Sequence, residues 1–465
     1  MTRLFRLAHH STSLRQEIIA GLTTFSTMAY IIFVNPAILS KAGMDFQSAM
    51  LATCLAAATG SLLTGLLSNY PFAQAPGMGL NAFFVYTLVF QAGYTWQGGL
   101  AVVFVSGVVF ILLTLSGWRA AIAEALPPAI LHAIPAGIGL FITLIGLNNA
   151  GIIDVNQGPI IDLVLSDAWQ EKGQLVDLVN QAPPQILQFG NLNDPNVLLA
   201  VLGFVLMAVL MLRNVTGAIL ISIVAISVLS LVTGLTPLPN RALSFQFDLT
   251  PTFLKLDFTQ LFGQADGSFF RKVLDLLAIL IAFTMVDLFD TLGTLYGTAE
   301  KGGFLDQDGK LPRINRALLA DAIATTLGSL LGTSTTTTYI ESGTGIVAGG
   351  RTGLTALVVG GLFLLCIFLS PLAGLIPTAA TSPALIMVGV LMLGSVRKIN
   401  FDDLSEAVPA FLVIVLMPFT YSIANGIGAG IIVYALLRLA KGEIRQLHPV
   451  MAIIAVLFII KFIMT

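Results

Sequence analysis

Charged side chains are scarce in this 465-residue chain, and their scarcity excludes most soluble classes of protein. Only 10% of the residues are Asp, Glu, Lys or Arg, whereas 56% are hydrophobic. A soluble domain carries about a quarter of its residues as charged ones. The formal net charge is −2, so the basic surface typical of nucleic-acid-binding proteins is also missing. We therefore expect a protein that is surrounded by membrane lipid, crosses the bilayer many times and binds no nucleic acid.

Cysteine and histidine are rare as well, with two and four residues respectively. Cys54 and Cys366 lie in hydrophobic runs without CxxC or Cys/His spacing, which indicates neither a disulfide framework nor a metal site. The hydrophobic segments contain no HExxH or GxSxG motif and no His/Cys cluster, so a membrane-embedded enzyme has no candidate residues. We expect a protein that is not an enzyme, holds no metal and needs no cofactor.

What the chain has in abundance is hydrophobic segments, which predict an all-α membrane protein with about fourteen crossings. The connection 235–271 separates two sets of about seven segments, and an odd number in each set gives the two sets opposite orientations, as in an inverted repeat. The final stretch, 405–464, holds one hydrophobic run more than this count needs. One of its runs must therefore be short, tilted or lying on the membrane surface.

Lys and Arg set the expected orientation, because cytoplasmic loops are enriched in them. The basic leader and most later Lys and Arg residues follow even-numbered segments, which places the N-terminus in the cytoplasm. The same count puts the acidic connection 150–194 and the connection 235–271 outside. The leader has no cleavage pattern, so the first helix should remain in a protein of the plasma (inner) membrane.

Two carboxylates interrupt the hydrophobic segment 274–297. Asp287 and Asp290 are three residues apart, so they share a helix face with Thr294 and should point together into a cavity. An ionised carboxylate at membrane depth costs several kcal/mol, which is typical of functional positions. The alternative is a structural role, with donors from neighbouring helices satisfying both acids.

Two segments look broken, and each is third in its set. In the first, Pro71 and Pro76 favour a short extended strand, and glycines follow before a short helix. In the second, the threonine run 335–338 favours a short extended strand before Glu341 and Ser342 open a short helix. Non-helical backbone at membrane depth survives where protein buries it or water lines it. Paired interruptions in matching positions indicate a transporter binding site made by half-helices.

The side chains at these interruptions suit a flat, mixed-polarity ligand better than a simple anion. Glu341 accepts hydrogen bonds, whereas Asn81 can both donate and accept. Alternatively, Glu341 caps a half-helix and Asn81 bridges two helices. Three aromatic residues could stack on a ring or could simply pack between helices: Phe83, Phe283 and Tyr339.

The paired aspartates also predict proton coupling. Two carboxylates one helical turn apart in a partly dehydrated site resist ionising together, so one of them should take up a proton. Proton entry down its gradient could then drive solute movement. The spacing does not decide whether Asp287 or Asp290 is the coupling residue.

Four stretches together resemble the Azg-like purine permeases, a branch of the nucleobase/ascorbate transporter (nucleobase:cation symporter) superfamily. The resemblance covers nearly the whole chain, and the stretches follow the family's order and spacing. They are EIIAGLTTFSTMAYIIFVNPAIL at 17–39, APGMGLNAFF at 75–84, VDLFDTLGTLYG at 286–297 and TTTTYIESGTGI at 335–346.

The resemblance implies a substrate, a fold and site residues. The substrate would be adenine, guanine or hypoxanthine moved with protons, and the assembly a homodimer. Core segments would lie within 17–116 and 272–370, and gate segments within 128–234 and 375–465. The family's functional positions fall on Gly79, Asn81, Asp287, Asp290 and Glu341, with Ser342 beside them.

A transporter of sulfate or bicarbonate on the same inverted-repeat scaffold is the alternative. Half-helix dipoles alone would hold the anion in such a site. Glu341 argues against it, because a fixed carboxylate repels an anion.

Overall fold

The computed structural model describes residues 5–116, 127–155, 187–237, 247–261, 269–307, 310–368, 375–443 and 447–464. Within these ranges, eight helices are long and apolar enough to cross a membrane, by length and composition, and five shorter apolar helices accompany them. A mostly helical, multi-pass architecture is thus confirmed, whereas the count of fourteen crossings stays a prediction. Most of the expected loop 150–194 and part of the loop 235–271 lie outside the described residues.

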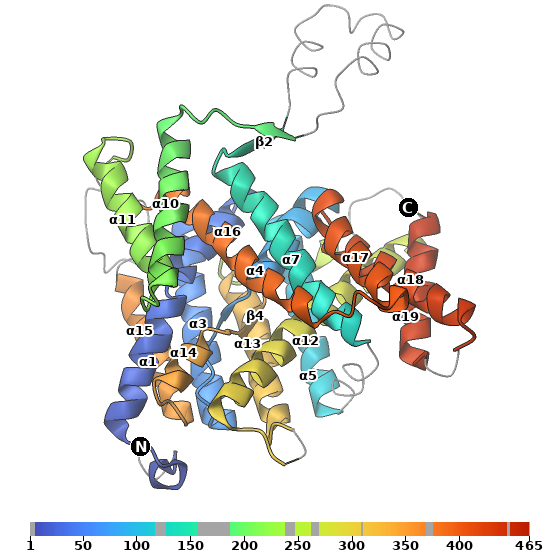
Figure 1. Ribbon diagram of the computed structural model, residues 1–465, viewed down its shortest axis with the longest axis horizontal. Helices are drawn as coiled ribbons and strands as arrows, with labels where there is room; N and C mark the ends of the chain where they lie inside the picture. Colours follow the sequence, from blue (N-terminus) through green and yellow to red (C-terminus); the bar gives the residue numbers. More distant parts are fainter. Residues whose placement is uncertain are drawn as a thin grey trace, which may run out of the picture.

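The first half of the chain is a series of helices with one interruption (Figure 1). After the short η1 (Leu7–His10), the helices before the interruption are α1 (Leu14–Met28), α2 (Ile31–Leu39), η2 (Ser40–Ala42) and α3 (Phe46–Ser68). The interruption consists of β1 (Gln74–Pro76), α4 (Met78–Ala82) and η3 (Phe83–Gln91), whose turns are π-helical. The elements after it are α5 (Trp96–Leu115), α7 (Pro128–Asn149), β2 (Ile153–Val155), β3 (Leu187–Phe189), α10 (Pro195–Leu212), α11 (Ala218–Val232) and η5 (Phe258–Gln260).

The second half repeats this order. It begins with the long α12 (Phe269–Gly302) and α13 (Ile314–Leu331), and its interruption is β4 (Thr336–Thr338) followed by α14 (Ser342–Val347). The remaining elements are α15 (Gly353–Cys366), α16 (Thr378–Leu393), η7 (Gly394–Lys398), α17 (Leu404–Phe419), α18 (Ile423–Ala440) and α19 (Pro449–Met464). A short strand and a short helix therefore occur at matching places in the two halves, where the sequence predicts them.

The two interruptions meet as an antiparallel ribbon inside the protein. Strand β1 pairs with β4 in the register Gln74 to Thr338, Ala75 to Thr337 and Pro76 to Thr336. Hydroxyl groups of neighbouring helices satisfy the outer edges: the Ser61 Oγ accepts from the Gln74 amide at 2.9 Å, and the Thr325 Oγ1 donates to the Thr336 carbonyl at 2.9 Å. Because protein groups satisfy these edges, strands can persist among membrane helices.

The helices pack into two groups, and the ribbon contacts α3 and α13 of the first group. In one group, α3 packs against α13 and α15, α5 packs against α13, and α1 packs against α14 and α15. In the other, the long α7 lies beside α16 and α17, with α10 on α16 and α18 on α17 (Figure 1). These groups correspond to the segments that the sequence assigns to a core and a gate, a division that stays a prediction.

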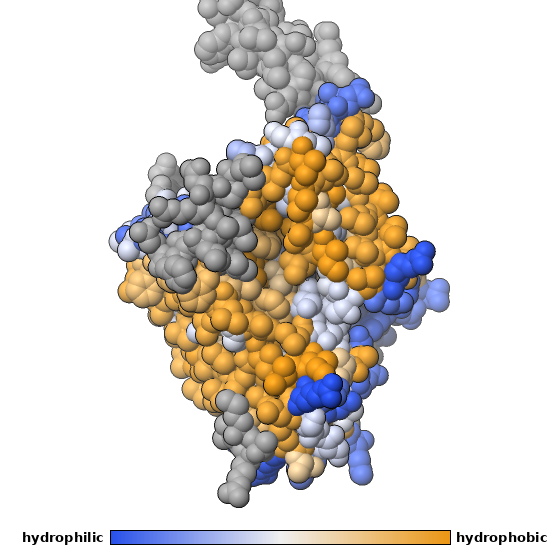
Figure 2. Space-filling model, turned by 90° about the vertical axis from the view of Figure 1, so that its left-hand side faces the viewer, coloured by the Kyte–Doolittle hydropathy of each residue, from blue (hydrophilic) through white to orange (hydrophobic). Residues whose placement is uncertain are grey.

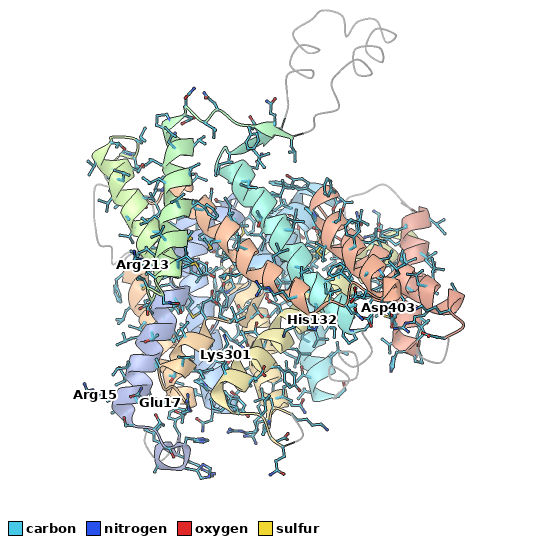
Figure 3. The ribbon with its side chains drawn as sticks, in the orientation of Figure 1. Arg15, Glu17, His132, Arg213, Lys301 and Asp403 are labelled. Carbon is cyan, nitrogen blue, oxygen red and sulfur yellow. The ribbon has the colours of Figure 1, made fainter. Side chains whose placement is uncertain are left out.

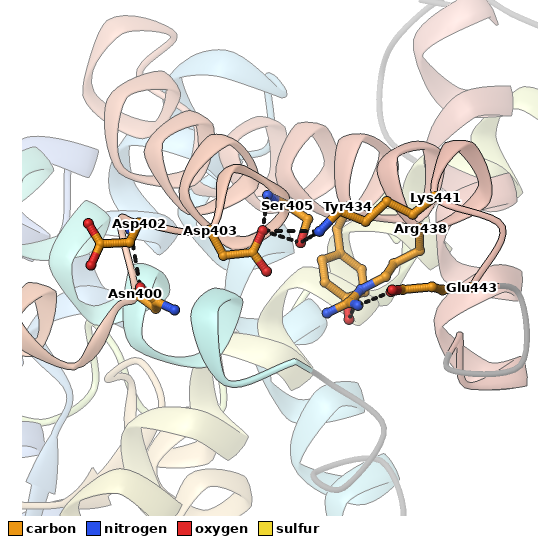
Figure 4. Close-up of polar contacts among 8 residues, drawn as sticks. All are labelled: Asn400, Asp402, Asp403, Ser405, Tyr434, Arg438, Lys441 and Glu443. Atoms are coloured by element: carbon orange, nitrogen blue, oxygen red, sulfur yellow. Dashed lines mark hydrogen bonds and ion pairs between the residues drawn. The ribbon is translucent and has the colours of Figure 1, made fainter.

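Exposed hydrophilic residues gather at the edges of the protein. Figure 2 shows a largely hydrophobic face with hydrophilic residues gathered toward one edge and the bottom. At one end of the α17–α18 hairpin, the Asp403 Oδ1 accepts from the Ser405 amide at 2.9 Å and from the Lys441 Nζ at 3.1 Å (Figure 4). Beside them, the Arg438 Nε donates to the Tyr434 hydroxyl at 3.1 Å. These contacts hold the ends of the two helices together outside the hydrophobic segments.

Candidate functional site

A cavity of about 950 Å³ lies between the two groups of helices. Its volume is at the upper end of the range of about 300–1,000 Å³ that is usual for ligand sites. One wall comes from α4, α12 and β4 and from the residues just before α14; the opposite wall comes from α7, α16 and η7. The cavity therefore borders both interruptions of the chain and both groups of helices.

One face of α12 forms the longest wall of the cavity. Asp290, Thr294, Gly297 and Glu300 follow one another at helical spacing along this face, from the inner part of the cavity to an exposed residue at its mouth. Asp287 is fully buried and is not among the lining residues, so the two aspartates do not share the cavity as the spacing suggests. Asp290 is the aspartate that a ligand in the cavity can reach.

Glu341 enters the cavity from the start of α14. Its Oε1 accepts a hydrogen bond from the Tyr30 hydroxyl at 2.8 Å, and its side chain makes no capping hydrogen bond to α14. The capping role is therefore not observed. Tyr339 also lines the cavity and donates its hydroxyl to the Pro76 carbonyl at 2.6 Å, which ties β4 to β1.

Ser342 lies behind this wall, fully buried. Its Oγ accepts from the Ala73 amide at 3.0 Å, so it joins the start of α14 to the chain before β1. The serine thus connects the two interruptions and does not line the cavity.

The first interruption contributes mainly backbone to the cavity, through Gly77, Met78 and Gly79. Gly79 packs closely against α7: a Cβ at this position would lie 2.6 Å from the Ile138 Cγ2. Asn81 is fully buried outside the cavity wall, and its Oδ1 accepts a hydrogen bond from the Ser334 hydroxyl. Its amide nitrogen has no hydrogen-bond partner among the described residues.

Two of the aromatic candidates pack against each other away from the cavity. The rings of Phe83 and Phe283 are 4.5 Å apart at 84°, an edge-to-face pair, and both side chains are fully buried. Neither lines the cavity, whereas Tyr339 does. Tyr339 is thus the aromatic candidate that the structure places within reach of a ligand.

Two residues that line the cavity, Tyr30 and His132, and one buried acid that interacts electrostatically with Asp290, Asp321, were not singled out from the sequence as functional. Tyr30 lies within the 17–39 stretch, but a tyrosine in a hydrophobic segment gives no specific signal. Asp321 is fully buried on α13, where the Thr291 hydroxyl donates to it at 3.1 Å. The criterion that singled out Asp287 and Asp290, an acidic residue within a hydrophobic segment, applies to Asp321 too. His132 lines the mouth beside Lys398, at the end of α7 shown in Figure 3.

Known structures share the arrangement of the chain. The transmembrane domain of a cyanobacterium bicarbonate transporter, BicA, superimposes with a TM-score of 0.61 over 89% of this chain and 97% of that one. The two sequences are 16% identical, so the likeness concerns the fold alone. Together with the membrane-length helices, it supports a multi-pass transporter fold.

Relatives at higher identity span the full chain. Adenine permease AdeP of Escherichia coli (strain K12) is 42% identical over 465 residues, which cover 100% of this chain and 96% of the relative. Guanine/hypoxanthine permease PbuO of Bacillus subtilis (strain 168) is 41% identical over 462 residues, covering 98% and 99%. Both relatives are transporters.

A family model matches nearly the same extent, over residues 15–169 and 176–429. The match includes both interruptions, α12 and the cavity wall of α7 and α16. It agrees with the predicted absence of enzymatic activity, since the family and these relatives are permeases. The chain belongs to the Permease family.

Proposed function

We propose that the protein is a proton-coupled symporter that imports purine bases, namely adenine, guanine or hypoxanthine, by alternating access. The observation that carries the proposal is the pair of carboxylates, Glu341 and Asp290, facing one cavity between two groups of helices. The printed names of the relatives, adenine permease and guanine/hypoxanthine permease, support the substrate class.

A purine base suits the chemistry of the cavity wall. Each of the three bases has N–H donors at its edge, and Glu341 supplies an acceptor for them. We propose that Glu341 and the backbone at Gly79 contact the base, with Tyr339 available for stacking. Asn81, Asp287 and Ser342 belong to the same site in the layer behind, where they fix its shape.

Asp290 is the residue to which we assign the coupling proton. It lines the cavity and lies within electrostatic range of Asp321 and Glu341. Carboxylates close together in a poorly hydrated site resist being ionised at once. Protonation of Asp290 on one side of the membrane and release on the other would couple base movement to the proton gradient. Asp287, buried one turn away, is the second candidate.

Alternating access requires that the cavity close on one side while it opens on the other. Its mouth carries Glu300, His132 and Lys398. Further along the same groups of helices, Tyr86 of η3 meets Phe141 of α7 with ring centroids 6.0 Å apart. This aromatic contact between the two groups supports a state that is closed near Tyr86 and open at the mouth.

The finer architecture belongs to the same proposal. About fourteen segments form two inverted sets of about seven. The core lies within 17–116 and 272–370, and the gate within 128–234 and 375–465. The short strands and helices at matching places support this division. The N-terminus is cytoplasmic, the membrane is the plasma (inner) membrane, and the assembly is a homodimer.

The anion-transporter alternative is less well supported. The bicarbonate transporter shares the fold at 16% identity, whereas the permease relatives are at least 41% identical over nearly the full length. A carboxylate in the cavity wall also disfavours an anion.

Uptake into proteoliposomes tests the proposal. Vesicles containing the protein receive radiolabelled adenine, guanine or hypoxanthine with and without an inward proton gradient. We expect accumulation of at least one base that disappears when a protonophore collapses the gradient. Transport of sulfate or bicarbonate without any purine uptake would overturn the proposal.

A further inference from the structure

Tyr30 occupies the junction between α1 and α2 and reaches the cavity from there. The side chain is only 1% exposed, yet it lines the cavity beside Glu341. Its hydroxyl is 2.8 Å from the Glu341 Oε1. A carboxylate has no proton to donate when ionised, so the phenol is the donor in this contact.

Helix α1 holds the start of α15, just beyond α14. Glu17, fully buried near the beginning of α1 and labelled in Figure 3, accepts from the Arg351 amide at 3.0 Å and from the Thr355 amide at 3.2 Å. The Arg351 amide lies just before α15, and the Thr355 amide lies in its first turn, where it also donates to the Thr352 carbonyl at 3.2 Å.

The middle of α14 also lies close to α1. The hydroxyl groups of Thr27 and Thr344 are 3.1 Å apart. Gly345 leaves no room for a side chain, because a Cβ there would lie 2.6 Å from the Ala20 carbonyl oxygen. Tyr30 thus binds Glu341 just before α14, and Glu17 binds residues that follow α14. With these contacts on both sides of α14, α1 and α14 form one unit, and the Glu341 carboxylate has a fixed place on it.

We propose that Tyr30 is a positioning residue for base recognition: its hydroxyl occupies the Glu341 Oε1 and thereby presents Oε2 to an N–H of the purine. The inference rests on the proposed function, because it assigns a role in binding the same substrate. Because Tyr30 already fixes the Glu341 carboxylate, the side chain loses little conformational entropy when the base binds. The affinity for the base is higher as a result. The phenol also keeps Glu341 in the role of acceptor toward the ligand.

The test is uptake of radiolabelled purine at graded concentrations by Tyr30→Phe, which keeps the ring and removes the hydroxyl. We expect KM to rise about tenfold, the effect of losing one hydrogen bond to a charged group, while the maximal rate changes less than about twofold. Tyr94→Phe is the matched control: its hydroxyl also donates to one acceptor, the Leu261 carbonyl at 3.1 Å, and neither of these two residues lines the cavity. It should retain the wild-type KM.

A double-mutant cycle separates positioning from a general structural role. Tyr30→Phe in a Glu341→Gln background should add less than about twofold to KM, because the residue acts through Glu341. Additive effects, or a wild-type KM in Tyr30→Phe, would overturn the inference. Failure of the proposed function would look different, since wild type and Tyr94→Phe would then take up no purine.

Discussion

The two interruptions of the chain share a topology but differ in what they give to the cavity. The β1–α4 interruption presents backbone at Gly77 and Gly79 and turns Asn81 inward, to Ser334. The β4–α14 interruption presents the Glu341 carboxylate, fixed by Tyr30. The two interruptions thus share a backbone arrangement, but one gives the cavity closely packed backbone and the other gives it a carboxylate.

Removing the carboxylate of the second interruption should have the largest effect. Glu341→Gln keeps the shape and replaces an acceptor-only group by an amide. We expect the KM for purine uptake to rise about 10- to 100-fold, equivalent to ~1.5–3 kcal/mol. Initial rates in cells with matched membrane abundance measure it. Glu300→Gln, at the exposed mouth of the same cavity, is the control and should stay near wild type; equal KM values in both variants would contradict the assignment.

Filling the space at the first interruption should have the second largest effect on uptake. In Gly79→Val the new side chain meets Ile138 on α7, and overpacking of this kind costs about 1–3 kcal/mol. We expect a lower maximal uptake rate because the two groups of helices can no longer approach closely. Adding Ile138→Ala should restore part of the rate. In contrast, Gly297→Ala also lies in the cavity wall but faces open space, and it should have little effect on the rate.

Asn81→Ala should have a smaller effect on KM than Glu341→Gln. It removes a neutral hydrogen bond to Ser334 behind the cavity wall, which is worth about 0.5–1.5 kcal/mol. We expect KM to rise about two- to tenfold, together with a lower melting temperature of the purified protein. If KM rose as much as in Glu341→Gln with unchanged melting temperature, Asn81 would contact the base directly.

The smallest effect should come from Asp403, outside the hydrophobic segments. Hydrogen bonds from the Ser405 amide and hydroxyl and from Lys441 lower the pKa of this carboxyl to about 2. Its stabilising contribution is thus present above the unfolded pKa of about 4 and is lost only as the pH falls toward about 2. Asp403→Asn should therefore leave the shape of the uptake profile between about pH 5 and pH 8 unchanged. A changed profile would mean that this hairpin end takes part in proton coupling.

Sequence patterns predict the interruptions well because their signals are local. Proline, glycine and a threonine run at matching places mark β1, α4, β4 and α14, and buried acids mark α12. Partners from distant segments leave no such signal. The contact between Tyr30 and Glu341 joins residues 311 positions apart, so no spacing rule reveals it.

Side-chain direction was also beyond the reach of sequence. The spacing of Asp287 and Asp290 places both on one face of a helix, but only Asp290 borders the cavity. The position of the cavity wall depends on how α7 and α16 approach α12, which is a property of tertiary packing. For the same reason Phe83 and Phe283 pair with each other and Tyr339 reaches the cavity.

An experimental structure determined in the presence of a purine base that the protein accumulates would test the central claim most directly. We predict that the flat base lies in the cavity between α12 and α7, with a ring or amino N–H within hydrogen-bond distance of the Glu341 Oε2. A base bound elsewhere, with the Glu341 carboxylate contacting only protein groups, would contradict the account.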